Sequence, residues 1–148
     1  MLPAPPPLVA EASPAALLSA VNFQRLLAGA RPLKADALLA RAARGHSRDM
    51  VARHYFAHTS PTGSSLRDRV KRTGWTRWRA NWALAENLAW GTGSLGTAAG
   101  IVDAWMHSPV HRANLLRSDL RRAGFGVAAG TPNAGAGGVT VTLDLGSR

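Results

Sequence analysis

Apolar side chains in the first third of the chain recur every three or four residues, the spacing of helices that bury one face. Ser13 followed by Pro14 is typical of a helix start, because serine caps the first turn and proline fits its first position. The pattern predicts one helix from there to Gly29. A second helix is predicted over 35–53, with Asp36 in its first turn.

Signals for helix ends and turns follow. His54 stands where helices commonly end in the left-handed conformation, which histidine tolerates better than most residues. The sequence SPTG then indicates a turn. The sequence SLRDRVKRT, over 65–73, predicts a short amphipathic helix with Ser64 as its cap and Gly74 as its end.

The second half of the chain changes from helix to strand patterns. We expect a strand over 84–90 and a helix over 97–107 that buries Trp105 and ends before Pro109, with one further turn in RANLL. RAGFGVAAG and GVTVTLDLG are strand-like runs around a Gly- and Asn-containing loop, which favours an antiparallel hairpin. Helices come first and strands later, so the fold class is α+β rather than alternating βαβ.

The length of 148 residues fits one domain. Residues 1–13 are rich in proline and alanine and are predicted to form a flexible arm, with the folded domain over 14–148. No apolar run reaches the roughly 20 residues of a transmembrane helix. The start, MLPAPPPLVAEASP, lacks the basic and apolar regions of a signal peptide, so an export signal lies upstream of this chain or does not exist.

The charge of the chain indicates candidate partners, and the absence of cysteine excludes some kinds of site. The formal net charge is +10, and only Lys34 and Lys71 among the cations are lysines. Because guanidinium groups favour phosphates and carboxylates, nucleic acid, anionic lipid and an acidic wall polymer are candidate partners; the alternative is an arginine-biased composition with a solvated surface. The lack of cysteine excludes disulfides, iron–sulfur clusters and cysteine-ligated zinc.

The histidines differ in how well their positions fit a catalytic or binding role. His54 and His58 have the four-residue spacing of a helical zinc motif, but Tyr55 stands where that motif needs glutamate, so a zinc protease of this type is disfavoured. His46 is expected to be a satisfied polar residue at the edge of the core. His107 and His111 are separated by Pro109 and should not share a helical face. His58 and His111, each predicted just outside a helix, remain as candidates.

Glu86 is the other candidate, because it lies in the apolar, aromatic sequence WALAENLAW. A buried carboxylate needs hydrogen-bond donors. Two imidazoles would supply them, and so would backbone N–H groups at a turn. The spacing alone leaves both alternatives open.

Four segments, HYFAHTSPTG, AENLAWG, AWMHSPVHRANLL and RAGFGVA, in this order resemble the bacterial branch of the CAP superfamily, the SCP-like domains related to cysteine-rich secretory proteins, antigen 5 and plant pathogenesis-related proteins 1. The resemblance implies a three-layer α-β-α sandwich with a small antiparallel sheet, an extracellular or cell-envelope location, and a cleft lined by histidines and acids. His58, Glu86 and His111 match the motif positions, while Asn87 is expected to brace a turn.

Two departures from the family pattern stand out. The sequence WMHSPVH lacks the second cleft glutamate of the eukaryotic branch, and AGAGGVTVT lacks the histidine before the last strand. The four-residue cleft is thus reduced to three candidates. An activity that needs the complete set is therefore not implied.

Three hypotheses follow. The first is an exported, monomeric binding domain whose cleft takes a lipid, a peptide or a cell-wall component. The second is a metal-dependent hydrolase in which His58, Glu86 and His111 hold Zn²⁺ or another divalent cation and leave a position open for water. The third is a binder of nucleic acid or another anionic polymer. Its basic and aromatic candidates are Arg67, Arg69, Lys71, Arg72, Arg77 and Arg79, interleaved with Trp75, Trp78 and Trp82.

Overall fold

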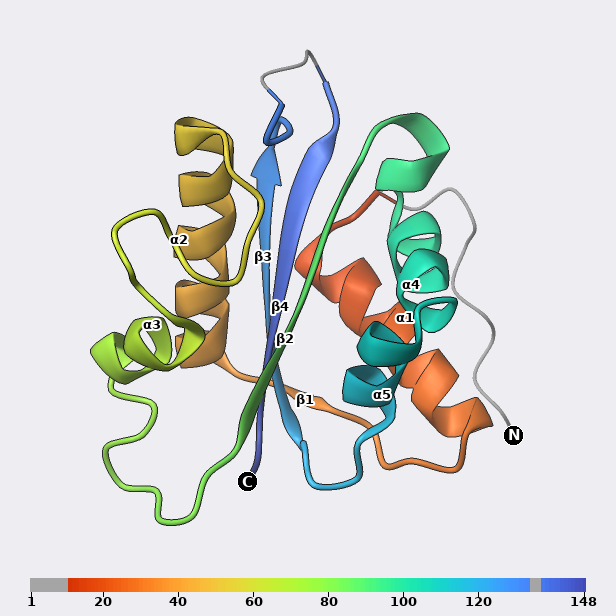
Figure 1. Ribbon diagram of the computed structural model, residues 1–148. Helices are drawn as coiled ribbons and strands as arrows, with labels where there is room; N and C mark the ends of the chain where they lie inside the picture. The colour runs from red at the N-terminus through yellow and green to blue at the C-terminus, as the bar shows by residue number, and fades with distance from the viewer. Residues whose placement is uncertain (1–10, 134–136) are drawn as a thin grey trace.

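A computed structural model describes residues 11–133 and 137–148, which form three layers (Figure 1). Helices α2 (Ala37–Arg53) and α3 (Leu66–Thr73) cover one face of a central sheet. Helices α1 (Pro14–Leu27), α4 (Ala98–Met106) and α5 (Pro109–Leu116) cover the other face. The predicted α+β class and the α-β-α sandwich are therefore confirmed. Within the described ranges, no helix has both the length and the apolar character needed to cross a membrane.

The sheet is mixed, which corrects the expectation of a purely antiparallel one. Its strand order is β1-β3-β4-β2. Strand β3 (Arg122–Ala129) and strand β4 (Val139–Gly146) form the predicted antiparallel hairpin, and β4 also pairs antiparallel with β2 (Leu84–Gly91). The two-residue strand β1 (Lys34–Ala35) adds a parallel pair with β3, because the chain enters α2 along that side. Strand β2 is thus an edge of the sheet.

Side-chain caps fix the helix starts, and two of them differ from expectation. Asp36 lies at the N-cap of α2 rather than in its first turn, and its Oδ1 accepts from the backbone N–H of Leu38 and Leu39. Ser65, not Ser64, caps α3, because Ser65 and Asp68 form a reciprocal capping box. At the end of α2, His54 adopts the predicted left-handed conformation, with φ of 55°.

Pro109 begins a helix of its own, which is longer than the one further turn expected in RANLL. Helix α4 ends at Met106, and α5 starts at Pro109 and runs for two turns, to Leu116. Proline is favourable there, because the first position of a helix requires no backbone N–H donor. His111 consequently lies inside a helix, which corrects its predicted place just outside one. A short 3₁₀ helix, η1 (Gly93–Gly96), links β2 to α4.

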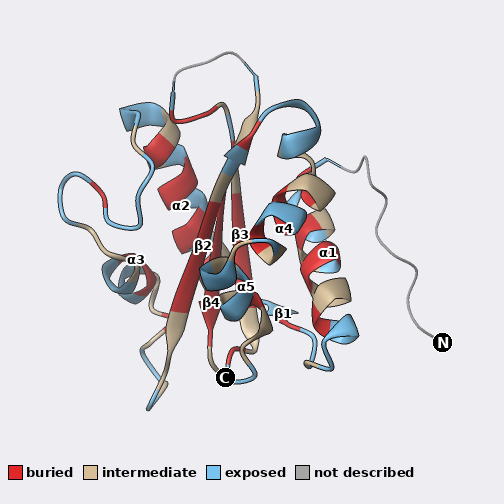
Figure 2. Ribbon diagram, turned by 45° about the vertical axis from the view of Figure 1, so that its right-hand side comes forward, coloured by how far each residue is buried: buried red, intermediate tan, exposed pale blue. Residues whose placement is uncertain are grey.

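The core has two parts, one on each face of the sheet. Trp105, 1 % exposed, belongs to the larger part, between the sheet and α1, α4 and α5. The smaller part lies under α2 and α3 and contains Trp75. Figure 2 shows the buried residues concentrated along the strands and the sheet-facing sides of the helices.

Two glycines of β3 bring α2 unusually close to the sheet. A Cβ atom at Gly124 would lie 2.0 Å from the backbone nitrogen of Ala40, and one at Gly126 would lie 2.1 Å from that of Arg44. Neither position can carry a side chain while α2 stays where it is. The close packing of α2 on β3 fixes the start of the loop that follows α2.

Residues 1–10 of the predicted arm lie outside the described residues. The remaining three residues of that arm pack on the domain. Glu11 forms an isolated antiparallel bridge with Thr97, Ala12 is buried, and the Ser13 hydroxyl caps α1 as predicted.

Candidate functional site

Glu86 is buried on the edge strand β2, and two side chains from the α2–α3 side of the sheet bind its carboxylate. The His58 Nδ1–H donates to Oε1 over 2.8 Å, and the Arg69 guanidinium donates to Oε2 over 2.7 Å. The predicted need for donors is confirmed, but the donors are one imidazole and one guanidinium rather than two imidazoles. Arg69, placed by sequence in an exposed basic cluster, is only 8 % exposed.

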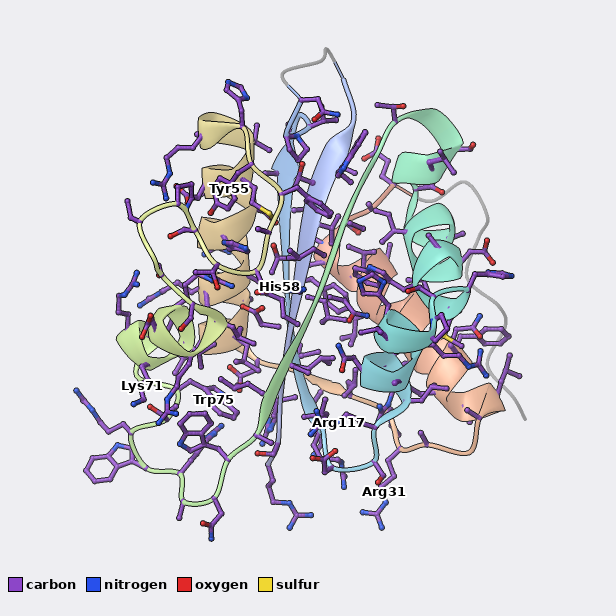
Figure 3. All side chains as sticks on the ribbon, viewed as in Figure 1. Arg31, Tyr55, His58, Lys71, Trp75 and Arg117 are labelled. Carbon is purple, nitrogen blue, oxygen red and sulfur yellow. The ribbon has the colours of Figure 1, made fainter. Side chains whose placement is uncertain are left out.

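Arg69 also positions the loop that carries His58. Its second terminal nitrogen donates to the backbone carbonyl of His58 over 2.8 Å and to that of Ser64 over 3.1 Å. The loop between α2 and α3 is thereby tied to the same side chain that binds Glu86. Figure 3 shows His58 between the α2 layer and the sheet. Arg69 therefore fixes both partners of the His58–Glu86 contact.

The charges at this contact support each other. Burial alone would raise the pKa of Glu86, but the hydrogen bond from His58, the neighbouring Asp144 and the charge of Arg69 lower it to about 2. The hydrogen bond to Glu86 in turn raises the pKa of His58 above its ordinary value. Near neutral pH, Glu86 is thus a permanent anion, and the charged form of His58 is favoured.

Asp144 is a residue of this site that sequence reasoning missed. It lies opposite Glu86 in the register of β2 and β4 and is fully buried. Neither of its carboxyl oxygens has a hydrogen-bond partner among the described residues. Burial and the neighbouring Glu86 raise the pKa of Asp144 well above its ordinary value, which favours its neutral, protonated form. The signal in the sequence was a single acid within the apolar run VTVTLDLG.

His111 reaches β2 from the opposite layer. Its backbone carbonyl accepts from the Asn87 side chain over 3.0 Å, and Asn87 in turn accepts from Asn114. Successive strand residues face opposite sides, so Glu86 faces α3 whereas Asn87 faces α5. The expected bracing role of Asn87 is thus played between a strand and a helix rather than within a turn.

The imidazole of His111 lies within electrostatic range of His58. Its Nδ1 lies 3.0 Å from the Ser108 hydroxyl. Burial, followed by the charge on His58, lowers the pKa of His111. The structure thus pairs His58 directly with Glu86 and places His111 near them, on the other side of the edge strand. We call His58, Arg69, Glu86, Asp144 and His111 the β2 site.

The donor set does not fit the expected three-ligand metal centre. Both oxygens of Glu86 are bound, one by His58 and one by Arg69. Within residues 11–133 and 137–148, no group of three or more His, Cys, Asp or Glu side chains is arranged to hold a metal ion. His58 and His111 each make their side-chain hydrogen bond through Nδ1, so the Nε2 atom of each ring remains available to a ligand.

The tryptophan-rich loop exposes only part of the predicted anion-binding surface. Trp75 is buried and donates its indole N–H to Asp36 over 3.0 Å. The guanidinium of Arg79 stacks over the Trp75 ring at 4.3 Å, and its charge lies 3.7 Å from Asp36. Trp78, by contrast, is 91 % exposed. Trp75 and Arg79 therefore anchor the loop, which leaves Trp78 as its projecting aromatic side chain.

His46 has the structural role expected of it. It is buried, and its Nε2–H donates to the backbone carbonyl of Ala57 over 2.8 Å. Burial lowers the pKa of His46, so this imidazole is neutral near pH 7. The contact holds the loop that leads to His58.

Comparison with known sequences agrees with this architecture. The chain is 37 % identical over 105 residues to the uncharacterized protein YkwD of Bacillus subtilis, a match that covers 71 % of this chain and 38 % of that protein. It is 36 % identical over 111 residues to the uncharacterized membrane protein YlbC of the same organism, which covers 75 % of this chain and 30 % of that protein. The chain thus spans about a third of the length of each of these relatives.

Solved structures share the fold. An extracellular protein of Bacillus anthracis that contains an SCP domain superposes with a TM-score of 0.75 at 26 % identity, over 91 % of this chain and 40 % of that one. An outer surface protein of Borrelia burgdorferi superposes with a TM-score of 0.70 at 22 % identity, over 89 % of this chain and 90 % of that one. The sequence profile of the CAP, or cysteine-rich secretory protein, family matches residues 18–144. The chain therefore belongs to the CAP family.

Proposed function

We propose that this CAP domain is an exported binding domain that takes a lipid, a peptide or a cell-wall component at the β2 site. The observation that carries the proposal is the position of His58. Its side chain is 59 % exposed, while its ring is fixed by the buried Glu86. In the protonated form, which Glu86 favours, this imidazole offers its Nε2–H to a phosphate, carboxylate or carbonyl oxygen of a ligand.

The same geometry argues against acid–base catalysis by Glu86. A general acid or base works best with a pKa near the operating pH, whereas the pKa of Glu86 is lowered to about 2. Both of its oxygens are also engaged by His58 and Arg69. Glu86 is therefore a positioning residue for His58.

The Ser108 hydroxyl contacts a histidine, as a serine nucleophile would. Its surroundings nevertheless favour a structural role. It contacts His111 Nδ1 from three residues away along the chain. A nucleophile–base pair also needs a third group that orients the base, as in the serine-protease triad. Among the described residues, His111 Nε2 has no such hydrogen-bond partner.

Export is part of the proposal and is supported by the solved structures. The Bacillus anthracis protein with an SCP domain is described as extracellular, and the Borrelia burgdorferi protein as an outer surface protein. A ligand from the cell envelope suits that location. Phe56, 45 % exposed and two residues before His58, adds an apolar side chain to the same loop.

Co-sedimentation tests this function. Purified peptidoglycan sacculi and phosphatidylglycerol vesicles are each incubated with the wild-type domain, the His58→Ala variant and the His107→Ala control, whose imidazole is 78 % exposed. We expect the wild type and the control to sediment with at least one of the two materials, and His58→Ala to remain in the supernatant. Equal sedimentation of all three proteins, or sedimentation of none, contradicts the proposal.

A second function, divalent-cation binding, is favoured by one observation. His58 donates its Nδ1–H to a carboxylate, which is how metal-binding histidines are commonly oriented, and this leaves the Nε2 lone pair for a metal in the neutral form. His58 and His111 would hold the cation. Zinc titration by calorimetry of the wild type, His58→Ala and His107→Ala checks it. Equal heats from the wild type and His58→Ala would remove this function.

A further inference from the structure

A polar cavity that His58 does not line lies on the α2–α3 side of the sheet. It has a volume of about 440 Å³ and lies between α2, α3 and the loop that joins them. We call it the α2–α3 pocket. Four guanidinium groups and one carboxylate line it. These belong to Arg41, Arg53, Arg69, Arg72 and Asp49.

The charges of the α2–α3 pocket do not balance. Arg53 is paired with Asp49, and Arg69 is paired with Glu86. Arg41 and Arg72, both exposed, make no salt bridge with a carboxylate among the described residues; the terminal nitrogen of Arg72 donates to the Ser64 hydroxyl. Two positive charges are therefore left without a counter-ion at one cavity.

Arg69 forms the buried floor of the α2–α3 pocket. It lines the cavity and is more than nine-tenths buried. Its terminal nitrogens are already used by Glu86 and by the carbonyls of His58 and Ser64. Arg69 therefore adds positive charge beneath the two exposed guanidinium groups, and Arg41 and Arg72 are the side chains left to contact an anion.

Hydroxyl groups complete the lining. Ser60, Thr62 and Ser64 come from the loop between the two helices. The Ser60 hydroxyl accepts from the backbone N–H of Ser64 and lies 3.1 Å from that of Thr62, which orders this side of the pocket. Guanidinium groups and hydroxyls together are the donors that proteins use for phosphate oxygens.

We propose that the α2–α3 pocket binds a phosphate ester through Arg41 and Arg72, above the buried charge of Arg69. The cavity is larger than a phosphate group alone, so it also takes part of the attached alcohol. The pocket shares Arg69 with the β2 site, but His58 does not line it, and the proposal does not rest on the function proposed above. The ester comes either from a soluble phosphorylated alcohol or from the headgroup of an anionic phospholipid.

Titration by nuclear magnetic resonance tests the proposal at low ionic strength. Glycerol phosphate is the soluble probe, and phosphatidylglycerol vesicles, followed by co-sedimentation, are the lipid probe. The variants are Arg41→Gln, Arg72→Gln and the control Arg77→Gln, which removes the same charge from an exposed position outside the pocket. All three replaced side chains are exposed, so the variants should fold.

We expect saturable binding by the wild type and by Arg77→Gln, with a shift of the Arg69 Nε–H signal on addition of glycerol phosphate. Each pocket variant should bind about tenfold more weakly, as for the loss of one charge-assisted hydrogen bond. Pocket-dependent binding of glycerol phosphate identifies a soluble ester, and pocket-dependent binding of vesicles alone identifies a headgroup. No saturable binding to either probe, or equal weakening by Arg77→Gln, overturns the proposal.

Discussion

Glu86 and Asp144 face each other across the β2–β4 ladder, both buried, and their pKa values are shifted in opposite directions. Two carboxylates side by side away from water cannot both be ionised at modest cost. Arg69 and His58 stabilise the charge on Glu86, which favours the protonated form of Asp144. The site is therefore a network of four side chains in which each depends on the others.

Removal of the central carboxylate should destabilise the fold. The Glu86→Ala variant leaves the buried Arg69 without its counter-ion and His58 without its acceptor, for which we expect a loss of about 3–5 kcal/mol in the free energy of unfolding. Urea denaturation measures it, with Asp103→Ala, at an exposed acid, as the control. A Glu86→Ala variant as stable as the control would show that the network contributes little.

The pKa of Glu86 predicts an acid-sensitive fold. The folded-state pKa of about 2 lies below the ordinary value of 4.5, so the stabilisation by Glu86 is complete above pH 4.5 and is lost as the pH falls toward 2. Denaturation of the wild type and of Glu86→Gln across this range checks it. The variant should lose less stability on acidification. Identical pH profiles would contradict the lowered pKa.

The contribution of Asp144 to stability should change with pH in the opposite direction to that of Glu86. The folded-state pKa of Asp144 lies well above the ordinary value of 3.8, so its contribution is most favourable at low pH and falls as the pH rises above 3.8. Asparagine has nearly the shape of the protonated acid and removes the titration. Asp144→Asn should therefore be at least as stable as the wild type at pH 7, as measured by thermal unfolding. A large drop in the melting temperature would show that Asp144 is ionised in the folded protein.

The pKa of His58 should lie above its ordinary value, and this shift should depend on Glu86. Because the pKa of His58 is raised, the stabilisation from its contact with Glu86 is complete below pH 6.5, the ordinary pKa, and is lost as the pH rises through the folded-state pKa. Nuclear magnetic resonance of the imidazole signals should show the His58 pKa above 6.5 in the wild type and lower in Glu86→Gln. An unshifted His58 in both proteins would contradict the contact.

Trp105 should be a major contributor to stability. Its ring is 1 % exposed, and its indole N–H donates to the carbonyl of Leu88 over 3.0 Å. Trp105→Ala should cost about 3–5 kcal/mol, since it opens a cavity and leaves that carbonyl without its donor. Trp78→Ala, at a 91 % exposed position, is the matched control and should unfold like the wild type in the same urea titration.

Local patterns were enough to predict most of the fold. Ser13, His54 and Gly74 mark helix boundaries through interactions with their immediate neighbours, and each lies where the sequence indicated. The starts of α3 and α5 were missed because Ser64 and Ser65 are adjacent candidates for one cap and because proline both ends and begins helices. The pairing of β2 with β4 involves residues distant along the chain, which periodicity does not reveal.

Because local patterns do not reveal contacts between distant residues, two members of the β2 site were missed. His58 and Glu86 matched a family motif, whereas Arg69 stood in a run of charges typical of a solvated face. Arg69 falls three residues after Leu66 and next to Val70, on the inward side of α3, and that spacing was the available signal. Asp144 could be linked to Glu86 only through the strand register, which is a tertiary property.

The two glycines under α2 limit how this domain can vary. Because Gly124 and Gly126 each touch the helix backbone, even one added methyl group would push α2 away from β3. The loop after α2 carries His58, so that displacement would loosen a hydrogen bond formed by residues distant along the chain. A substitution at either glycine of the hairpin would thus disturb the His58–Glu86 contact at the β2 edge of the sheet, without altering either of those side chains.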